Sequence, residues 1–222
     1  MTNTPSVMES QLSVFSPDQA RQEWNRVAAE NPEVSRTHSA LVDHLGLSSA
    51  AELSDPQHFG TSGTFKLSSA VPVPQEVANP PAQEVLTIES SLTVQSHTAQ
   101  DQQVAECVAS LVGSPAGLRV DRVFTLSTTS DQFVSGVKEH VTGSSGQLVT
   151  VDGWWDALKS CLSSSDCGGQ CITAALTCPP ATWAVYLACL AGRCGLCVVK
   201  CAACATCDCT WWCRIGAGCC NN

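Results

Sequence analysis

Cysteine is the residue type in this chain with the greatest capacity for chemistry. Fourteen of the 15 cysteines lie between Cys161 and Cys220, more than one residue in five. Thiols at this density form disulfide bonds, bind metal ions or act as nucleophiles. The remaining one, Cys107, stands alone among apolar residues and is predicted to be a small buried hydrophobic side chain. The fourteen are Cys161, Cys167, Cys171, Cys178, Cys189, Cys194, Cys197, Cys201, Cys204, Cys207, Cys209, Cys213, Cys219 and Cys220.

The residues between these cysteines favour a disulfide scaffold. Their number is even, and the intervals are filled mostly with Ala, Leu, Val, Ile, Gly and Trp. A segment this short cannot bury enough apolar surface to fold unaided, and crosslinks are the usual remedy. Each bridge contributes about 2–4 kcal/mol by constraining the unfolded chain. We therefore predict that all fourteen are disulfide-bonded.

The spacing of the cysteines predicts two helical pieces that fold back on each other. Pro179-Pro180 separates them, and residues 181–205 have a helical pattern beyond it. Cysteines at spacings of three and four form a stripe along one face of each piece. In an antiparallel hairpin we expect Cys171 near Cys189, Cys167 near Cys194, and Cys161 near Cys197 or Cys201.

Metal binding is the alternative chemistry. Cys194-x-x-Cys197 and the run Cys201-x-x-Cys204-x-x-Cys207 match halves of zinc sites, and that run also opens an iron–sulfur pattern. The iron–sulfur pattern requires a further cysteine where Trp211 stands. The apolar intervals and the lack of histidine in this region favour disulfides, so we predict no cofactor. An intracellular zinc or iron–sulfur protein remains the alternative function.

Aromatic residues flank the cysteine-rich region. Tryptophan favours the membrane interface, and a neutral, apolar, crosslinked helical hairpin is suited to lie on a bilayer. The alternative is that these side chains fill a small core. Because two adjacent indoles are hard to bury together, we expect at least one of each pair to be exposed. The predicted membrane-interface residues are Trp154, Trp155, Trp183, Trp211 and Trp212.

The charge of the chain excludes one class of partner. The net charge is −9, and all of it falls before residue 152, where acidic and Gln/Ser/Thr-rich segments dominate. Without a cluster of Lys or Arg, the chain has no electrostatic footprint for nucleic acid. No Cys/His/Asp nucleophile arrangement is visible either, so we predict that the protein is not an enzyme. The five histidines are scattered: His38, His44, His58, His97 and His140.

The remaining elements predict a small α+β N-terminal region and a disulfide-rich, mainly α-helical C-terminal hairpin module. Residues 1–47 form a helical leader-like segment, with Ser16-Pro17 starting a helix to about residue 30 and a second helix over 34–45. Residues 48–83 are a flexible linker because they are rich in proline, serine and glycine. Residues 84–151 are a small α+β domain, with strands at 84–95, 119–128, 133–141 and 147–151 and a helix at 99–112. Residues 152–222 are the cystine-rich apolar module.

An acidic N-terminal part followed by an apolar cystine-rich peptide resembles the precursors of halocin-C-like bacteriocins. The similarity covers about the last 65 residues and is carried by SCLSSSDCGGQC (Ser160–Cys171), TWAVYLACLAGRCGLCVVKCAAC (Thr182–Cys204) and the final pair Cys219–Cys220. The resemblance implies an antimicrobial peptide released by proteolysis. We expect this peptide to begin between about Gly146 and Trp155.

The resemblance also implies the partners of such a precursor. They are the membrane of competing target cells, a processing protease, an exporter and an intramolecular immunity contact with the N-terminal part. The first residues of the chain lack a charged region, an apolar region and a twin-arginine pair, so no standard signal peptide is seen. We therefore expect secretion after processing.

Overall fold

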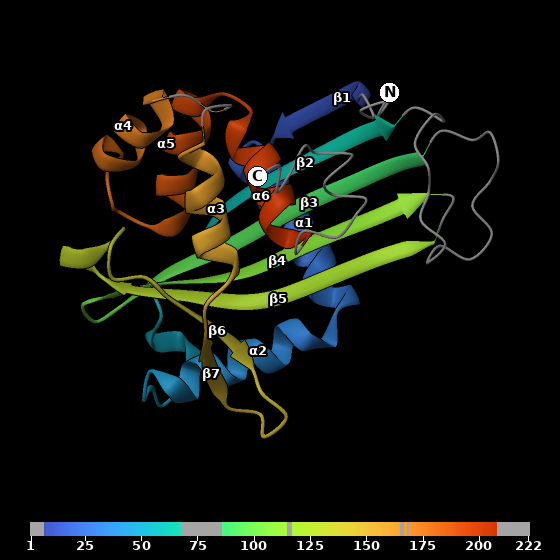
Figure 1. Cartoon of the computed structure of the whole chain (residues 1–222). Helices are drawn as coiled ribbons and strands as arrows, with labels where there is room; N and C mark the ends of the chain where they lie inside the picture. Colours follow the sequence, from blue (N-terminus) through green and yellow to red (C-terminus); the bar gives the residue numbers. More distant parts are fainter. Residues whose placement is uncertain (1–6, 68–85, 115–116, 165–166, 168, 208–222) are drawn as a thin grey trace.

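A single seven-stranded antiparallel sheet organises the molecule (Figure 1). The computed structural model describes residues 7–67, 86–114, 117–164, 167 and 169–207. The strands are hydrogen-bonded in the same order as they occur along the chain. They are β1 (Val7–Val14), β2 (Gln57–Leu67), β3 (Leu86–Ala99), β4 (Gln102–Ser114), β5 (Leu118–Thr129), β6 (Lys138–Thr142) and β7 (Leu148–Val151).

Helices cover both faces of this sheet. In Figure 1 the N-terminal pair, in blue, lies behind and below the sheet, and four C-terminal helices, in orange and red, lie in front of it and toward the upper left. The lower pair is α1 (Pro17–Glu30) and α2 (Pro32–His44); the upper helices are α3 (Trp154–Leu162), α4 (Gly169–Thr177), α5 (Trp183–Cys194) and α6 (Cys197–Thr206). Two short 3₁₀ helices, η1 (Ala50–Glu52) and η2 (Ser130–Gln132), complete the set among the described residues.

The N-terminal helices follow the predicted signals closely. Ser16 caps α1, its side chain accepting from the backbone N–H of Gln19 while the Gln19 side chain accepts from the backbone N–H of Ser16. Asn31 ends α1 and caps α2, where its side chain accepts from the backbone N–H of Glu33. The strands predicted at 84–95, 119–128 and 147–151 correspond to β3, β5 and β7, and only the second half of the one at 133–141 is strand, in β6.

The predicted helix at 99–112 is wrong, because these residues form most of β4. This strand lies in the middle of the sheet between two long partners, and helices cover it on both faces. A strand that is buried on both sides loses the polar–apolar alternation of a half-exposed strand, so its pattern resembles that of a buried helix. Pairing along both of its edges decides its conformation.

The predicted linker at 48–83 contains β2, which pairs with β3 along its whole length. The glycines of this segment contributed to the prediction of a flexible linker. A side chain at Gly60 would place its Cβ 2.5 Å from the ring of Phe15, so glycine here allows close packing and is not a sign of flexibility. Residues 68–83 of the predicted linker lie outside the described residues.

The sheet therefore extends beyond the region predicted for the α+β domain. β1 and β2 come from segments predicted as leader and linker, and they complete a sheet with the strands of 84–151. The combination of antiparallel strands, helices and a helical disulfide-rich C-terminal region is as expected, whereas a separate small N-terminal α+β unit is not distinct in the structure.

Candidate functional site: disulfide-linked helices on an apolar sheet face

Four disulfide bonds link the C-terminal helices into a ladder. Each bond joins a cysteine on or just after α3 or α4 to a cysteine on α5 or α6. The bonds are nested, so that each outer pair encloses the next pair along the sequence. Such nesting is the pattern of an antiparallel hairpin closed by consecutive crosslinks. The pairs, from outermost to innermost, are Cys161–Cys201, Cys167–Cys197, Cys171–Cys194 and Cys178–Cys189.

The antiparallel arrangement was predicted, but the register of the pairing was not. Cys178 takes Cys189, so the expected pairs of Cys171 with Cys189 and of Cys167 with Cys194 are wrong by one step. The reason is the turn at Pro179-Pro180. This turn is short, because Thr182 already caps α5, and Cys178 directly before it faces the first cysteine of that helix. Cys161 pairs with Cys201, one of its two expected partners.

The helix predicted over 181–205 is divided in two. α5 ends at Cys194 and α6 begins at Cys197, with a bend of 119° between them. Gly195 occupies the break with a φ of 59°, a backbone conformation that glycine adopts without strain. Cys204 and Cys207 on and after α6 are also disulfide-bonded. The remaining predicted disulfide residues, Cys209, Cys213, Cys219 and Cys220, lie outside the described residues, as do Trp211 and Trp212.

Tryptophan side chains join these helices to the sheet. Trp183 is fully buried, its ring centroid 4.5 Å from that of Phe133 and 5.1 Å from that of Trp155, edge to face. Its indole N–H donates to the backbone carbonyl of Gln103 on β4, at 3.4 Å. Trp154 packs against Phe124 of β5, with ring centroids 4.9 Å apart. The indoles therefore fill the layer between helices and sheet.

The expectation that one member of the Trp154–Trp155 pair is exposed is wrong. Both are buried, because α3 lies on the sheet with α6 beside it, and the Trp154 indole N–H donates to the Thr206 hydroxyl on that neighbouring helix. A shared core thus receives two adjacent indoles that a small isolated hairpin could not bury. The membrane-interface role of Trp154, Trp155 and Trp183 stays a prediction about the helices after separation from the sheet.

The sheet face below these helices is built from a straight row of apolar residues. Phe59, Val94, Cys107 and Phe124 are direct cross-strand partners on β2 to β5, and all four belong to the same core cluster as the C-terminal helices. Cys107 is a free thiol with no exposed surface, and burial raises its pKa well above the usual range. Its predicted role as a buried hydrophobic residue is confirmed.

A buried carboxylate connects the sheet to the start of α3. Glu139 on β6 accepts from Arg122 on β5, at 2.5 Å, and from the backbone N–H of Trp155, at 3.0 Å. A negative charge at the first turn of a helix is stabilising because that turn has unpaired N–H groups. Gly153 precedes α3, and a Cβ there would lie 2.8 Å from the Arg122 guanidinium. Glycine thus leaves room for the arginine beneath the helix.

The next row of the sheet, which points to the opposite face, is polar. His58, Gln95, Glu106, Thr125 and His140 are successive cross-strand partners on β2 to β6. This row lies on the side of α1 and α2, and it differs from the apolar row by a single residue step along each strand. Because successive side chains in a strand point to opposite faces, one register sets both surfaces.

Three of the histidines gather near one end of this row. Glu106 is almost fully buried; it lies 3.0 Å from Nδ1 of His38 on α2 and accepts from the Gln95 amide at 3.4 Å. The same amide lies 3.1 Å from Nε2 of His97, and its oxygen lies 3.2 Å from Nε2 of His58. The hydrogen bond to Glu106 raises the pKa of His38, and burial lowers the pKa of His58.

A second pair of histidines lies at β6. His140 is buried; its two ring nitrogens lie 3.1 Å from the Ser127 hydroxyl and 3.2 Å from the Thr150 hydroxyl. Its ring centroid is 5.0 Å from that of the exposed His44 at the end of α2. Burial first, and then the charges of His44 and Lys138, lower the pKa of His140 to about 4. All five histidines thus lie on or beside the α1–α2 face, a convergence that sequence analysis missed because only strand register creates it.

His140 is expected to make the protein sensitive to acid. Its ordinary pKa of 6.5 falls to about 4 in the folded state, so the unfolded chain binds more protons between these values. Neutral His140 therefore favours the folded state fully above pH 6.5. As the pH falls toward 4, protonation of the unfolded chain lowers the free energy of unfolding, by about 3 kcal/mol at most. His140→Asn is expected to flatten the decline of the urea midpoint between pH 7 and pH 4.5.

His44→Gln is the matched control for this prediction. His44 is exposed, and burial, not His44, is the main cause of the lowered pKa of His140. The control is therefore expected to retain most of the acid sensitivity. His38 acts in the opposite sense, because its raised pKa gives stabilisation below pH 6.5 that is lost as the pH rises through the folded value. An unchanged decline in His140→Asn would contradict the assignment.

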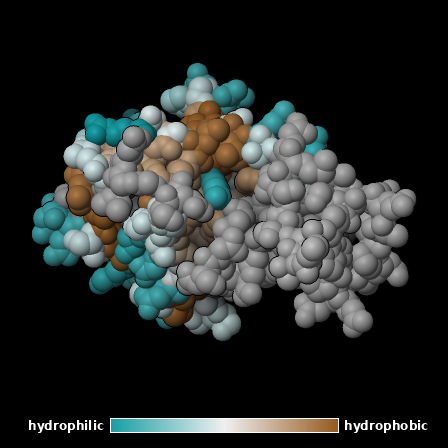
Figure 2. Space-filling view, turned by 45° about the horizontal axis from the view of Figure 1, so that its top comes forward, coloured by the Kyte–Doolittle hydropathy of each residue, from teal (hydrophilic) through white to brown (hydrophobic). Residues whose placement is uncertain are grey.

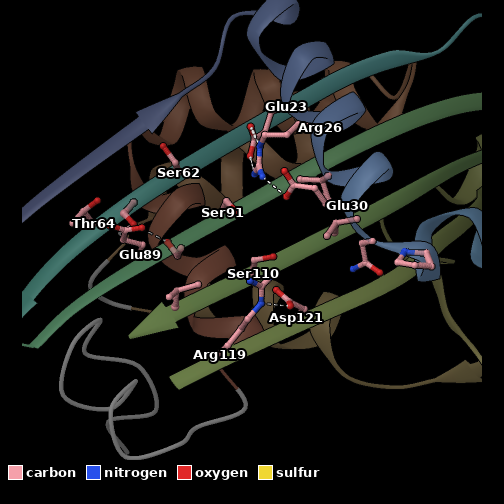
Figure 3. A pocket seen from close by; sticks show the side chains of 17 residues that line it. Glu23, Arg26, Glu30, Ser62, Thr64, Glu89, Ser91, Ser110, Arg119 and Asp121 are labelled. Atoms are coloured by element: carbon pink, nitrogen blue, oxygen red, sulfur yellow. Dashed lines mark hydrogen bonds and ion pairs between the residues drawn. The ribbon is translucent and has the colours of Figure 1, made fainter. Parts of the chain in front are cut away.

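A polar hollow of about 600 Å³ lies on the same side, where α1 and the start of α2 leave part of the sheet uncovered (Figure 3). Hydroxyl groups of Ser62, Ser91 and Ser110 line its floor. Its arginines are already paired: Arg26 reaches Glu23 and Glu30 on α1, and Arg119 reaches its neighbour on β5, Asp121. The two arginines are outnumbered by the acidic side chains of the lining, so the hollow carries a net negative charge and has the character of a solvated sheet face.

The outer surface of the C-terminal helices carries some apolar side chains. Leu176 on α4 is 77% exposed, and Val185 on α5 and Leu196 before α6 are 37% and 45% exposed. Figure 2 shows brown hydrophobic atoms interspersed with teal hydrophilic ones on the side turned forward from the top of Figure 1. Among the described helices none is individually long and apolar enough to cross a bilayer; α5 and α6 meet that test only as a bent pair, by length and composition.

Comparison of the chain with protein-family models, with curated proteins and with solved structures finds no match. The function is therefore inferred from the chain's own geometry. That geometry is a disulfide-linked set of apolar helices seated on a complementary sheet face, and disulfide bonds of this number are typical of proteins that mature in an oxidising environment.

Proposed function

We propose that the chain is the precursor of a secreted, disulfide-stabilised antimicrobial peptide that acts on the membranes of competing cells. The peptide begins between about Gly146 and Trp155 and runs to Asn222. The preceding residues form a leader and immunity region that holds the peptide in an inactive state. A processing protease and an exporter complete its maturation.

The observation that carries this proposal is the shared core. The apolar sides of α3, α5 and α6 pack on the apolar row of the sheet, with Trp154 and Trp183 between them, and α4 packs against α5. A membrane-active peptide needs this same apolar surface to enter a bilayer. While the helices lie on the sheet, their indoles are buried and withheld from lipid. Packing on the sheet and insertion into a bilayer would therefore compete for the same apolar surface of the helices.

The connection between the two parts is accessible. The turn between β6 and β7 has exposed residues from Ser144 to Gln147, and β7 is a short strand at the edge of the sheet. Exposed loop tips with small residues are preferred sites of proteolysis. Cleavage in this turn would cut the chain without breaking any contact of α3 to α6 with the sheet. Release would then be a second step, governed by the buried interface.

A site-specific protease sequence in place of Ser144-Ser145 tests the proposal. After cleavage the two fragments are expected to remain together on gel filtration, because the interface is unchanged. The C-terminal fragment, separated in denaturant without reductant and refolded, is expected to release dye from lipid vesicles and to inhibit the growth of sensitive cells. The uncut protein is expected to do neither.

Adding back the N-terminal fragment provides the matched control. This fragment carries the apolar sheet face and is expected to suppress vesicle leakage when it is present in equimolar amount. A fragment with Phe124→Asp places a charge in the middle of that face and is expected to lose the suppression. Failure of the oxidised C-terminal fragment to permeabilise vesicles or to inhibit any tested strain would refute the proposed activity.

A further inference from the structure

Two of the four described disulfide bonds lie in direct contact. The Sγ atom of Cys167 is 3.7 Å from the Sγ atom of Cys201, although the two belong to different bridges. The sulfur atoms of Cys161, Cys167 and Cys201 all lie within 4.8 Å of one another. The fourth sulfur, that of Cys197, is bonded to Cys167. Four sulfur atoms therefore form one group between α3 and α6.

The separation between the two bridges of this group matches that between ligands of a tetrathiolate metal site. Zinc bound by four thiolates has Zn–S bonds of about 2.3 Å, so neighbouring sulfurs in the tetrahedron lie about 3.8 Å apart. The contact between Cys167 and Cys201 already has this separation. Among the described residues, no other group of three cysteine, histidine or acidic side chains is so closely spaced. The histidines of the opposite sheet face are thus not an equivalent candidate.

We propose that in the reduced protein Cys161, Cys167, Cys197 and Cys201 bind one zinc ion. The metal takes the place of the two bridges that these residues form when oxidised. Its ligands come from the end of α3, from Cys167 after that helix, and from the first turn and a half of α6. The proposal concerns a stage before disulfide formation and does not depend on whether the oxidised peptide kills cells.

The local structure favours thiolates at these positions. Cys197 is the first residue of α6, where the unpaired N–H groups of the helix lower the cost of a negative charge. Cys201 follows one turn later on the same face, which gives two ligands from one helix. Zinc binding releases the thiol protons, so affinity is expected to rise with pH. A bound ion would hold α3 against α6 in the register that the bridges later lock.

Cobalt provides the direct test with the full-length chain. The protein is reduced with a phosphine under anaerobic conditions, freed of metal and titrated with Co²⁺. We expect one equivalent to bind with the intense visible bands of a tetrahedral tetrathiolate site, and Zn²⁺ to displace it. With zinc bound, an alkylating reagent is expected to spare Cys161, Cys167, Cys197 and Cys201 and to modify Cys178 and Cys189.

Variants separate this site from the other cysteines. Cys201→Ser is expected to weaken cobalt binding by at least about 100-fold, more than the loss of an outer-shell partner costs. Cys178→Ser/Cys189→Ser removes the innermost bridge and is the matched control; it should leave the spectrum unchanged. Cys204→Ser/Cys207→Ser tests the competing run of ligands from 201 to 207 and should also leave it unchanged.

Three outcomes would overturn the proposal. The first is a reduced protein that shows no tetrahedral thiolate spectrum with cobalt. The second is loss of the spectrum in Cys204→Ser/Cys207→Ser, which would assign the metal to that run of cysteines. The third is uniform alkylation of all cysteines in the presence of zinc. The alkylation pattern uses the unmodified sequence, so it decides the matter even if Cys201→Ser fails to fold.

Discussion

Reduction of the disulfide bonds in the presence of a chelator is expected to unfold the C-terminal helices and to expose the apolar face of the sheet. The four described bridges are nested. Once the inner bridges are formed, each outer bridge adds only a short loop, made of the few residues between it and the next bridge. Each is then worth about 2–3 kcal/mol, and together they approach the whole stability of an ordinary domain. Loss of the near-ultraviolet circular dichroism of the buried indoles, with binding of a hydrophobic dye, measures the effect.

The same reduction with zinc in place of the chelator is the control. If the metal site proposed above forms, most of the indole signal is expected to remain. The single bridge between Cys178 and Cys189 is the innermost one, so Cys178→Ser/Cys189→Ser should cost only its own share of about 2–3 kcal/mol. A fully reduced, metal-free protein that keeps its native spectrum would show that sheet packing alone holds the helices.

Replacing Trp183 by alanine is expected to be the most damaging single substitution. The indole is fully buried against Phe133, Trp155 and Tyr186, and its N–H donates to a backbone carbonyl of β4. Removal leaves a cavity between helices and sheet and removes the hydrogen bond to that carbonyl. The expected loss in unfolding free energy is about 3–5 kcal/mol, measured by denaturant titration of the oxidised protein.

Leu176→Ala is the matched control for Trp183→Ala. This leucine lies on the same C-terminal set of helices, but 77% of it is exposed, so its loss should change stability by less than about 0.5 kcal/mol. Equal effects of the two substitutions would mean that Trp183 does not join the helices to the sheet. In the cleaved protein, Trp183→Ala should also speed dissociation of the two fragments, since its contacts belong to their interface.

These two predictions describe one property of the molecule. The cysteine-rich helices are crosslinked among themselves, yet their buried indoles depend on the sheet. The disulfide bonds preserve the fold of the helices after separation from the sheet. The buried indoles determine how strongly the helices bind the sheet before separation. The precursor proposed above, which would store and then release an apolar peptide, requires both, and different residues supply them.

Sequence analysis captured the elements that depend on neighbouring residues. The cap at Ser16, the end of the first helix at about residue 30, the break after Pro179-Pro180 and the fold-back of the cysteine stripes all follow from local backbone chemistry. It failed at β4 and β2, where partners up to 60 residues away decide the conformation. It also misplaced the pairing register, because the length of a turn is set by where Thr182 caps the next helix.

A crosslinked, apolar, helical C-terminal region could be predicted from the sequence alone, since cysteine density and apolar intervals are properties of composition. The surface on which that region packs could not, because it depends on tertiary structure. A one-residue alternation along four strands places Phe59, Val94, Cys107 and Phe124 beneath the C-terminal helices and a row of histidine and glutamate side chains on the other face. That alternation depends on strand register, which forms only when distant segments pair.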